Sequence, residues 1–201
     1  MDLEVEGQLQ PTSSNKYRAL YLFAGVEREA DLASAAVIVL LEQDPEAEIE
    51  FENVDILRGG EAHNLLKGAR QEEYLRRLEK GYYDALMTAA PCNTHSRALY
   101  FDDNGPPPCR NLQFPWGYPN LSGSDKTRIE DANSLIRFSL LALKAALTCT
   151  SKVVFVLGEF PEDLGDCRGQ SPASLWQLPE THEVVGLGPS EEPSTNARFR
   201  Q

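Results

Sequence analysis

A cysteine stands at the end of an apolar run, directly behind a proline. The run DALMTAA, residues 84–90, leads into Pro91 and Cys92, and polar residues follow. A cysteine thiolate is a strong nucleophile once its pKa is lowered by its surroundings. Proline has a fixed φ and no N–H, which suits it to a rigid turn. The pattern favours a nucleophile held at the end of a strand over the alternative, a small residue that fills space in the core.

A glutamate occupies the same position after another apolar run. Glu159 follows VVFVLG, residues 153–158. A carboxylate at such a place is suited to general acid–base work, particularly if its pKa is raised. Glu162 and Asp163 carry the same charge close by, so they remain alternatives for this role, and a solvated loop acid is the simpler interpretation of all three.

Two further runs place a glycine or an acidic side chain at the end of a predicted strand. The run YRALYL, residues 17–22, ends in Phe23, Ala24 and Gly25, and a glycine after a strand is an ordinary turn residue that also leaves the backbone open. Asp55 follows IEFENV, residues 49–54, and Glu52 lies within that run. Either could meet a ligand at this edge or be a surface acid in an acid-rich stretch.

The spacing of apolar residues places these groups in an α/β fold. It predicts four strands, over residues 18–23, 49–56, 83–89 and 152–160, the last two as buried strands. It predicts three helices, over residues 28–43, 63–81 and 127–150, with Gly81 behind the second and a capping box at Thr127 and Glu130. Alternating strands and helices favour a mostly parallel sheet with helices on both faces. Ligands of such sheets bind at the carboxyl ends of the strands, where the groups above fall.

Composition and charge narrow the classes of function. The chain has 201 residues and a net charge of −12, which argues against nonspecific coating of nucleic acid. No run is long and apolar enough for a membrane helix, and no signal peptide begins the chain, so we expect an intracellular protein of the cytoplasm or nucleus. Four scattered cysteines fit reduced thiols better than disulfides. We expect a disordered lead-in over 1–16, one catalytic domain over 17–180 and a polar tail over 181–201.

Three motifs, taken in order, resemble the DNA cytosine-5 methyltransferase family. LYLFAGVEREADL is similar to its first motif, a strand that ends in Phe-x-Gly. APCNTHSRA is similar to its nucleophile motif, and VFVLGEFPEDLG places Glu159 where the family has a glutamate after a later strand. The resemblance covers residues Tyr17 to Gln177, and each motif falls at the edge of a predicted strand.

The resemblance implies a Rossmann-like, AdoMet-dependent methyltransferase fold and a reaction on cytosine. Cys92 would add to C6 of the base, and Glu159 would hydrogen-bond the N3 and amino edge. S-adenosyl-L-methionine would be held by a second set of residues: Phe23, Ala24, Gly25, Asp55 and Asp84. The partner would be DNA, with RNA as the other nucleic acid, and the target base would be flipped out of the stack.

The long segment from Pro91 to Asp125 would close over that base. Arg97 and Arg110 are its candidates for nucleic-acid contact. Trp116 and Tyr118 are candidates for stacking. The alternative for Trp116 is a hydrophobic plug that packs the loop onto its own domain, and we favour the plug because prolines bracket it.

Departures from the family pattern leave an alternative function open. Glu27 stands where the first motif prefers glycine, and Phe160 and Pro161 replace the usual residues after the glutamate. A chain of this length has no room for a separate target-recognition domain. The alternative is a catalytically degenerate scaffold that binds a partner.

Cys92 and His95 have the spacing of metal ligands, but we expect no metal because no second close Cys/His pair exists. A Cys–His hydrolase is also less favoured, because such partners generally meet through the fold and not through local sequence.

Overall fold

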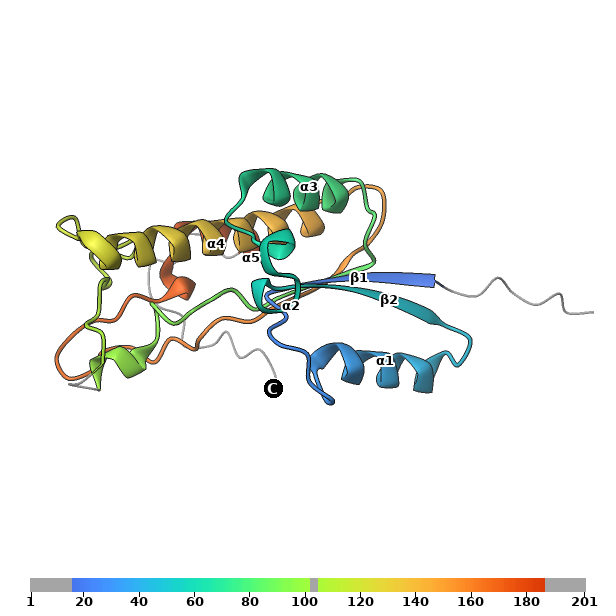
Figure 1. The fold of residues 1–201 in the computed structure, drawn as a ribbon, viewed down its shortest axis with the longest axis horizontal. Coiled ribbons are helices and arrows are strands. Elements are labelled where there is room, and N and C mark those ends of the chain that lie inside the picture. The colour runs from blue at the N-terminus through green and yellow to red at the C-terminus, as the bar shows by residue number, and fades with distance from the viewer. Residues whose placement is uncertain (1–15, 102–104, 187–201) are drawn as a thin grey trace, which may run out of the picture.

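The computed structural model describes residues 16–101 and 105–186, which form one parallel sheet with helices packed on it (Figure 1). The four strands lie in the order β2-β1-β3-β4. Their bounds are β1 (Lys16–Leu22), β2 (Glu48–Val54), β3 (Ala85–Thr88) and β4 (Phe155–Gly158). All neighbouring strands are parallel, which confirms the predicted α/β class and the parallel sheet. The expected lead-in, apart from Lys16, lies outside the described residues.

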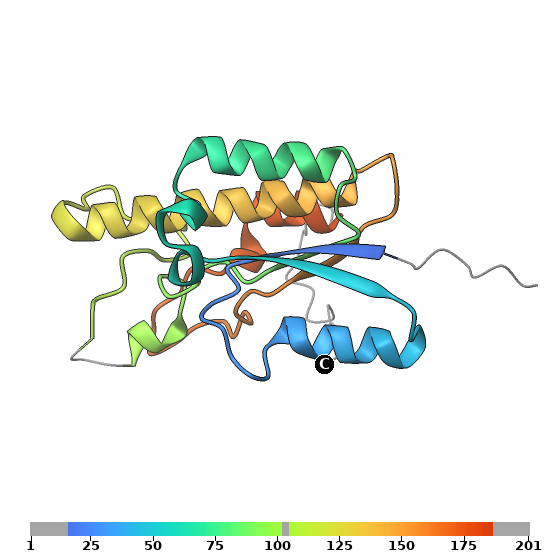
Figure 2. The same cartoon turned by 45° about the vertical axis from the view of Figure 1, so that its right-hand side comes forward.

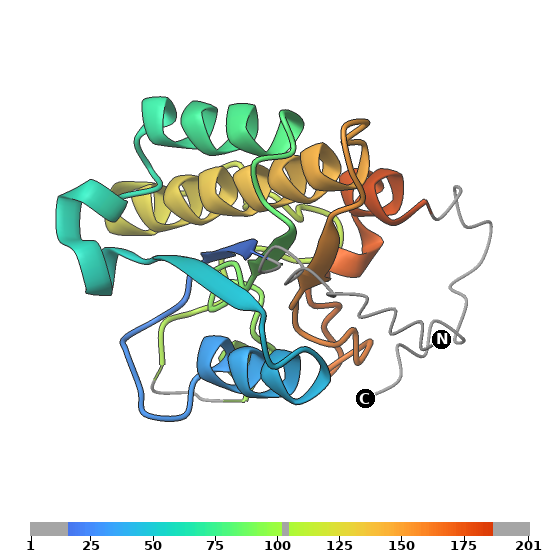
Figure 3. The same ribbon diagram turned by 90° about the vertical axis from the view of Figure 1, so that its right-hand side faces the viewer.

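Helices cover the two faces of the sheet unequally. Helix α1 (Leu32–Gln43) lies on one face, and α3 (Gly68–Glu79), α4 (Gly123–Leu147) and α5 (Pro179–Val185) lie on the other, as Figures 2 and 3 show. The remaining helical pieces are short: α2 (Ile56–Gly59), η1 (Gly60–His63), η2 (Arg97–Tyr100) and η3 (Leu175–Gln177). The side with three helices is therefore the thicker layer.

Helix boundaries differ from the sequence prediction where local chemistry intervenes. The second predicted helix begins only at Gly68, because α2, capped by Asp55, and η1 occupy the residues before it. Gly81 follows it at a φ of 66°, which confirms the expected glycine behind the helix. The capping box at Thr127 and Glu130 is wrong, since α4 begins at Gly123 and both residues lie inside it.

The predicted start of the C-terminal tail at residue 181 is wrong as well. Helix α5 continues to Val185, and Leu178 and Thr181 are buried where it meets the rest of the domain. A segment with few apolar residues can still be ordered when two or three of its side chains reach the core. Residues 187–201 lie outside the described part of the chain.

The core lies almost entirely on the α3 and α4 side. Leu20, Leu22, Leu86 and Ile136 are fully buried in one cluster there. On the other side, Ala33 is the buried residue of α1.

Helix α1 and the edge strand β4 both carry exposed apolar side chains. Ile38 and Val39 of α1 are 59% and 58% exposed, and Phe155 of β4 is 61% exposed. The expectation of a buried strand at 152–160 is therefore wrong, because β4 forms an edge of the described sheet and three of its four residues are exposed.

The strand order creates a switch point at the carboxyl edge. The chain leaves β1 for β2 on one side and later returns to β3 on the other, so the connections diverge between β1 and β3. Leu22 is in register with Val54 and Thr88, and Thr88 with Gly158. All four strands consequently end at the same level, and the segments that follow them begin side by side.

Candidate active site at the carboxyl edge of the sheet

The four segments carry the predicted residues to one edge of the sheet. Phe23 and Gly25 follow β1, Asp55 follows β2, Cys92 follows β3 and Glu159 follows β4. They form two halves, which we call the Gly25 half, behind β1 and β2, and the Cys92 half, behind β3 and β4.

The turn in the Gly25 half is strained and tightly held. Phe23 has a φ of 62°, which is rare for a bulky residue, and Gly25 has a φ of 68°. The backbone N–H groups of Phe23 and Ala24 both donate to the carbonyl oxygen of Val54, at 2.8 and 3.3 Å. A Cβ placed on Gly25 would meet open space within the described structure. The turn therefore leaves the backbone of residue 25 accessible from outside.

Asp55 supports this turn from the end of β2. Its Oδ2 accepts a hydrogen bond from the Gly25 N–H at 3.0 Å, and its Oδ1 accepts one from the Leu57 N–H at 2.8 Å as the cap of α2. Each carboxylate oxygen has a second lone pair, so Asp55 keeps capacity for a ligand hydroxyl. The alternative, Glu52, is held elsewhere, by Tyr83 and Arg77.

Two residues of the Gly25 half escaped the sequence prediction. The Arg58 Nε donates to the Gly25 carbonyl oxygen at 2.8 Å, and its Nη2 donates to Asp31 Oδ2 at 2.7 Å. Hydrogen bonds from the Ser34 backbone, from Arg58 and from the Ser34 hydroxyl lower the pKa of Asp31 to about 2. Aspartate is a preferred N-cap residue, so the sequence could have predicted a capping role for Asp31 before the helix. No local pattern in the sequence predicts the partners of Arg58.

Tyr21 lies between the two halves. Burial, and then the negative charge of Asp31, raise the pKa of its phenol, with smaller contributions of the same sign from Glu159 and Asp55. A single side chain that feels carboxylates from both halves indicates that the halves are electrostatic neighbours.

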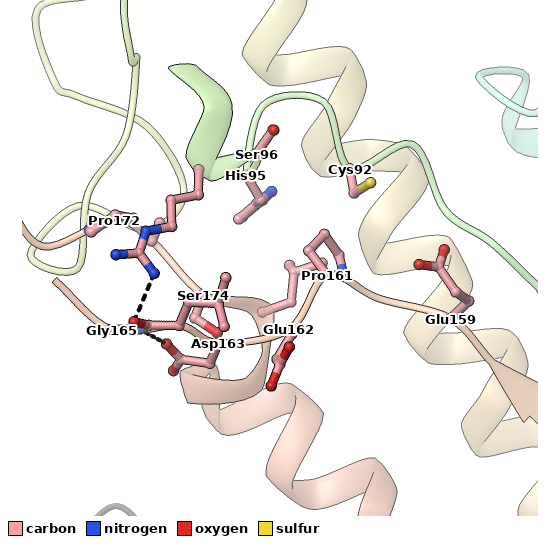
Figure 4. Close-up of a pocket in the computed structure, with 14 residues that line it drawn as sticks. Cys92, His95, Ser96, Glu159, Pro161, Glu162, Asp163, Gly165, Pro172 and Ser174 are labelled. Carbon is pink, nitrogen blue, oxygen red and sulfur yellow. Dashed lines mark hydrogen bonds between the residues drawn. The ribbon is translucent and has the colours of Figure 1, made fainter. Parts of the chain in front are cut away.

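The Cys92 half contains a pocket of about 360 Å³ (Figure 4). Cys92 and Glu159 both line it, which brings the predicted nucleophile and the predicted acid–base residue to one cavity. Its far wall is the loop after β4, and Figure 4 shows that loop facing the segment from Cys92 to Ser96.

Glu162 and Asp163, the alternatives to Glu159, also line this pocket. Asp163 is occupied within the loop, since its Oδ1 accepts from the Gly165 N–H at 3.0 Å and its Oδ2 from Gln177 at 2.6 Å. Glu159 is the one that acts on the thiol: burial, and then the charge of Glu159, raise the pKa of Cys92. The resting cysteine is therefore a thiol at neutral pH.

Arg97 does not present a free guanidinium to nucleic acid. Its Nη1 donates to the Leu164 carbonyl oxygen at 2.8 Å and its Nη2 to the Asp166 carbonyl oxygen at 2.7 Å. In this structure Arg97 ties the loop after β4 to the loop after β3, and its contact with nucleic acid stays a prediction.

Arg110 cannot contact nucleic acid in this structure either. Its side chain is 1% exposed, with Nη1 bonded to the Pro115 carbonyl oxygen at 2.9 Å and 3.0 Å from His95 Nε2. The prediction is wrong because the loop that carries Arg110 folds inward. Trp116 packs against the core in the same loop, which confirms the plug interpretation.

Asp84 lies at the wrong end of the sheet for cofactor binding. It precedes β3, and its oxygens accept from Lys152 Nζ at 2.7 Å and from the Arg18 N–H at 2.8 Å. The carboxyl edge is a full strand length away, so we withdraw Asp84 from the site and assign it a structural role.

Over residues 16–101 and 105–186, no group of three or more histidine, cysteine or acidic side chains is arranged to hold a metal ion. In the same ranges, no helix combines the length and apolar character needed to cross a membrane. All four cysteines are free thiols. No protein-family model, curated protein or solved structure matches this chain.

Proposed function

We propose that this chain is an AdoMet-dependent methyltransferase that acts on cytosine in DNA through a covalent cysteine adduct. The observation that carries the proposal is the pairing of Cys92 and Glu159 in one pocket, beside the strained Gly25 turn at the switch point of the sheet. Free thiols at all four cysteines suit the intracellular setting that this reaction requires.

The Gly25 half fits the cofactor. The open space over Gly25 allows a ligand to approach the backbone, and Asp55 stands at the end of β2 with lone pairs to spare. Phe23, Ala24, Gly25 and Asp55 would hold S-adenosyl-L-methionine, which supplies an electrophilic methyl group when bound.

The Cys92 half suits addition to a pyrimidine. In the proposed step, the Cys92 sulfur forms a bond to C6 of cytosine, and the electron pair of the C5–C6 double bond moves to make C5 nucleophilic. The thiol proton passes to Glu159 and from there to N3, so that the adduct gains no net charge. The raised pKa of Cys92 suits this order of events, because the thiol keeps its proton until cytosine is bound and the proton can pass through Glu159 to N3.

Covalent trapping tests the proposal. Fluorine at C5 of 5-fluorocytosine cannot leave as a proton, so the covalent adduct cannot break down after methyl transfer. An active enzyme incubated with S-adenosylmethionine should therefore remain attached to DNA that contains 5-fluorocytosine. Mass spectrometry should detect the complex as an increase in protein mass. Cys92→Ser should abolish the adduct. Cys149→Ser is the matched control, because Cys149 bonds Ser151 near the opposite edge and should leave trapping intact. An adduct that persists in Cys92→Ser would remove Cys92 from the mechanism.

A second candidate function is favoured by a separate observation. Arg97 and Arg110 are both engaged within the chain, and Ile38 and Val39 of α1 are exposed. A non-catalytic scaffold that binds another protein through α1 would account for both. Absence of S-adenosylmethionine binding and of any DNA adduct in a folded sample would support this scaffold.

A further inference from the structure

A buried histidine and a buried arginine meet behind the wall of the Cys92 pocket. His95 is 7% exposed and Arg110 is 1% exposed. The Arg110 Nη1 lies 3.0 Å from His95 Nε2 and also donates to the Pro115 carbonyl oxygen at 2.9 Å. The backbone N–H of His95 donates to the Cys92 carbonyl oxygen at 2.8 Å, which ties the pair to the nucleophile.

The contact between the two side chains determines the tautomer of the imidazole. A guanidinium can only donate hydrogen bonds, so His95 Nε2 must accept. A neutral imidazole carries one proton, which must then be on Nδ1. A 180° flip of the imidazole ring would put a carbon atom in the place of Nε2 and lose the hydrogen bond from Arg110.

Burial and charge keep this imidazole neutral. Burial, and then the positive charge of Arg110, lower the pKa of His95 to about 3. The positive charge of a second arginine, Arg128, also acts on Arg110. Arg128 donates hydrogen bonds to the Cys109 sulfur and to Asp125. Protonated His95 would add a third positive charge to this region, so the ring does not titrate in the physiological range and cannot serve as a base for Cys92.

The Nδ1 proton has no acceptor within the described part of the chain. A buried donor without a partner costs about 1–3 kcal/mol, so a ligand acceptor that reaches this N–H would recover that cost. His95 itself lines the pocket, and Figure 4 shows it between Cys92 and Ser96.

We propose that Arg110 locks His95 as a neutral Nδ1–H donor that recognises a carbonyl oxygen of the ligand in the Cys92 pocket. The inference rests on the proposed function and deepens it: the acceptor in cytosine would be the 2-carbonyl oxygen. Arg110 is a positioning residue, acting through His95, and Glu159 is left as the group that takes the thiol proton.

The tautomer can be tested without any ligand. Long-range ¹H–¹⁵N NMR of the whole chain labelled at histidine nitrogen should show His95 with a protonated Nδ1 and an unprotonated Nε2, unchanged from pH 5 to 8. A proton on Nε2, or titration within that range, would overturn the lock. In Arg110→Met the ring should lose its single tautomer; if that variant does not fold, the wild-type spectrum still decides.

The donor role can be tested by protection of the thiol. Pyrimidin-2-one carries the carbonyl and pyrimidine lacks it, so only the former should slow alkylation of Cys92 by iodoacetamide, measured on the Cys92 peptide by mass spectrometry. His95→Gln keeps an N–H donor and should retain most of this difference. His95→Phe keeps an aromatic ring without a donor and should reduce it about tenfold.

His182→Phe is the matched control, since His182 lies on α5 and contacts the Trp176 carbonyl oxygen outside the pocket wall. Equal protection by the two probes, or protection by neither, would overturn the donor role. Protection that follows the expected pattern in a protein that never traps 5-fluorocytosine DNA would leave His95 as a carbonyl donor and reject the methyltransferase proposal alone.

Discussion

The two halves of the carboxyl edge follow neighbouring strands of one sheet but differ in how their polar groups are used. In the Gly25 half, Asp55 and Arg58 bond the N–H and the carbonyl oxygen of Gly25, and Arg58 also bonds Asp31. In the Cys92 half, His95 Nδ1 and two nitrogens of Arg110 have no partner among the described residues. One half is complete by itself, and the other is not.

This difference separates a preformed turn from a site that waits for its ligand. A satisfied network holds backbone in a strained shape, as at Phe23, whereas unsatisfied buried donors are stabilised only when something binds. We therefore expect changes in the Gly25 half to alter stability and cofactor binding. Changes in the Cys92 half should alter reactivity with little loss of stability.

The largest effect is expected from Gly25→Val. Valine at a φ of 68° costs roughly 1–2 kcal/mol in backbone strain, and its side chain would fill the open space above the turn. Binding of S-adenosylmethionine, measured by titration calorimetry, should be abolished. Gly169→Val is the control, because Gly169 has a φ of 74° and open space in a turn outside the site. If both variants bind the cofactor equally, the Gly25 turn is not its cradle.

Asp55→Ala should come next and act on stability first. The change removes the cap of α2 and the acceptor for the Gly25 N–H, and a lost cap costs about 0.5–2 kcal/mol. For a domain of this size, each kcal/mol lowers the melting temperature by about 2–4 °C. Asp55→Asn, which keeps acceptor oxygen at the cap, should recover much of the loss in thermal unfolding. A melting temperature unchanged by Asp55→Ala would show that the Gly25 half is not held by this network.

Glu159→Gln should change reactivity and leave stability nearly unchanged. The negative charge of Glu159 contributes to the raised pKa of Cys92, so its removal lowers that pKa and increases the thiolate fraction at pH 7.5. Alkylation of Cys92 by iodoacetamide should therefore become faster, because the thiolate is the reactive form. Glu162→Gln, in the same pocket, is the control and should have a smaller effect. Slower alkylation in Glu159→Gln would contradict the electrostatic coupling.

The smallest effect is expected from Asp31→Asn, as a function of pH. The pKa of Asp31 is about 2 in the folded chain against 3.8 in the unfolded reference, so the stability from its bonds is present above pH 4 and lost as the pH falls toward 2. Asp31→Asn should thus lower the midpoint of urea unfolding by its largest amount at pH 7, and it should change that midpoint very little at pH 2. Glu27→Gln, which removes a carboxylate from the exposed segment before α1, is the control for a general effect of lost negative charge. A penalty that is equal at both pH values would mean that Asp31 is not held as an anion.

Much of the architecture followed from pattern alone. Apolar runs of strand length, separated by amphipathic segments, specified four parallel strands and their helices, because burial of an apolar face is decided by local periodicity. The same strand boundaries place Asp84, which directly precedes β3, at the amino edge of the sheet. Exposure of α1 and β4 was not predictable in this way, since an apolar segment does not reveal how much of its surface a neighbour covers.

What the sequence by itself determined was the set of four strands and the presence of Cys92, Glu159, Gly25 and Asp55 near their carboxyl ends. Each of these residues closely follows a strand, so its place in the sequence fixes its place at the end of that strand. Only the tertiary structure decided the burial of Arg110, the bonds of Arg97 to the loop after β4, the bond from Arg58 to Asp31 and the tautomer of His95. These depend on side chains that meet across loops, and a long polar side chain has no preferred partner until the backbone around it is in place.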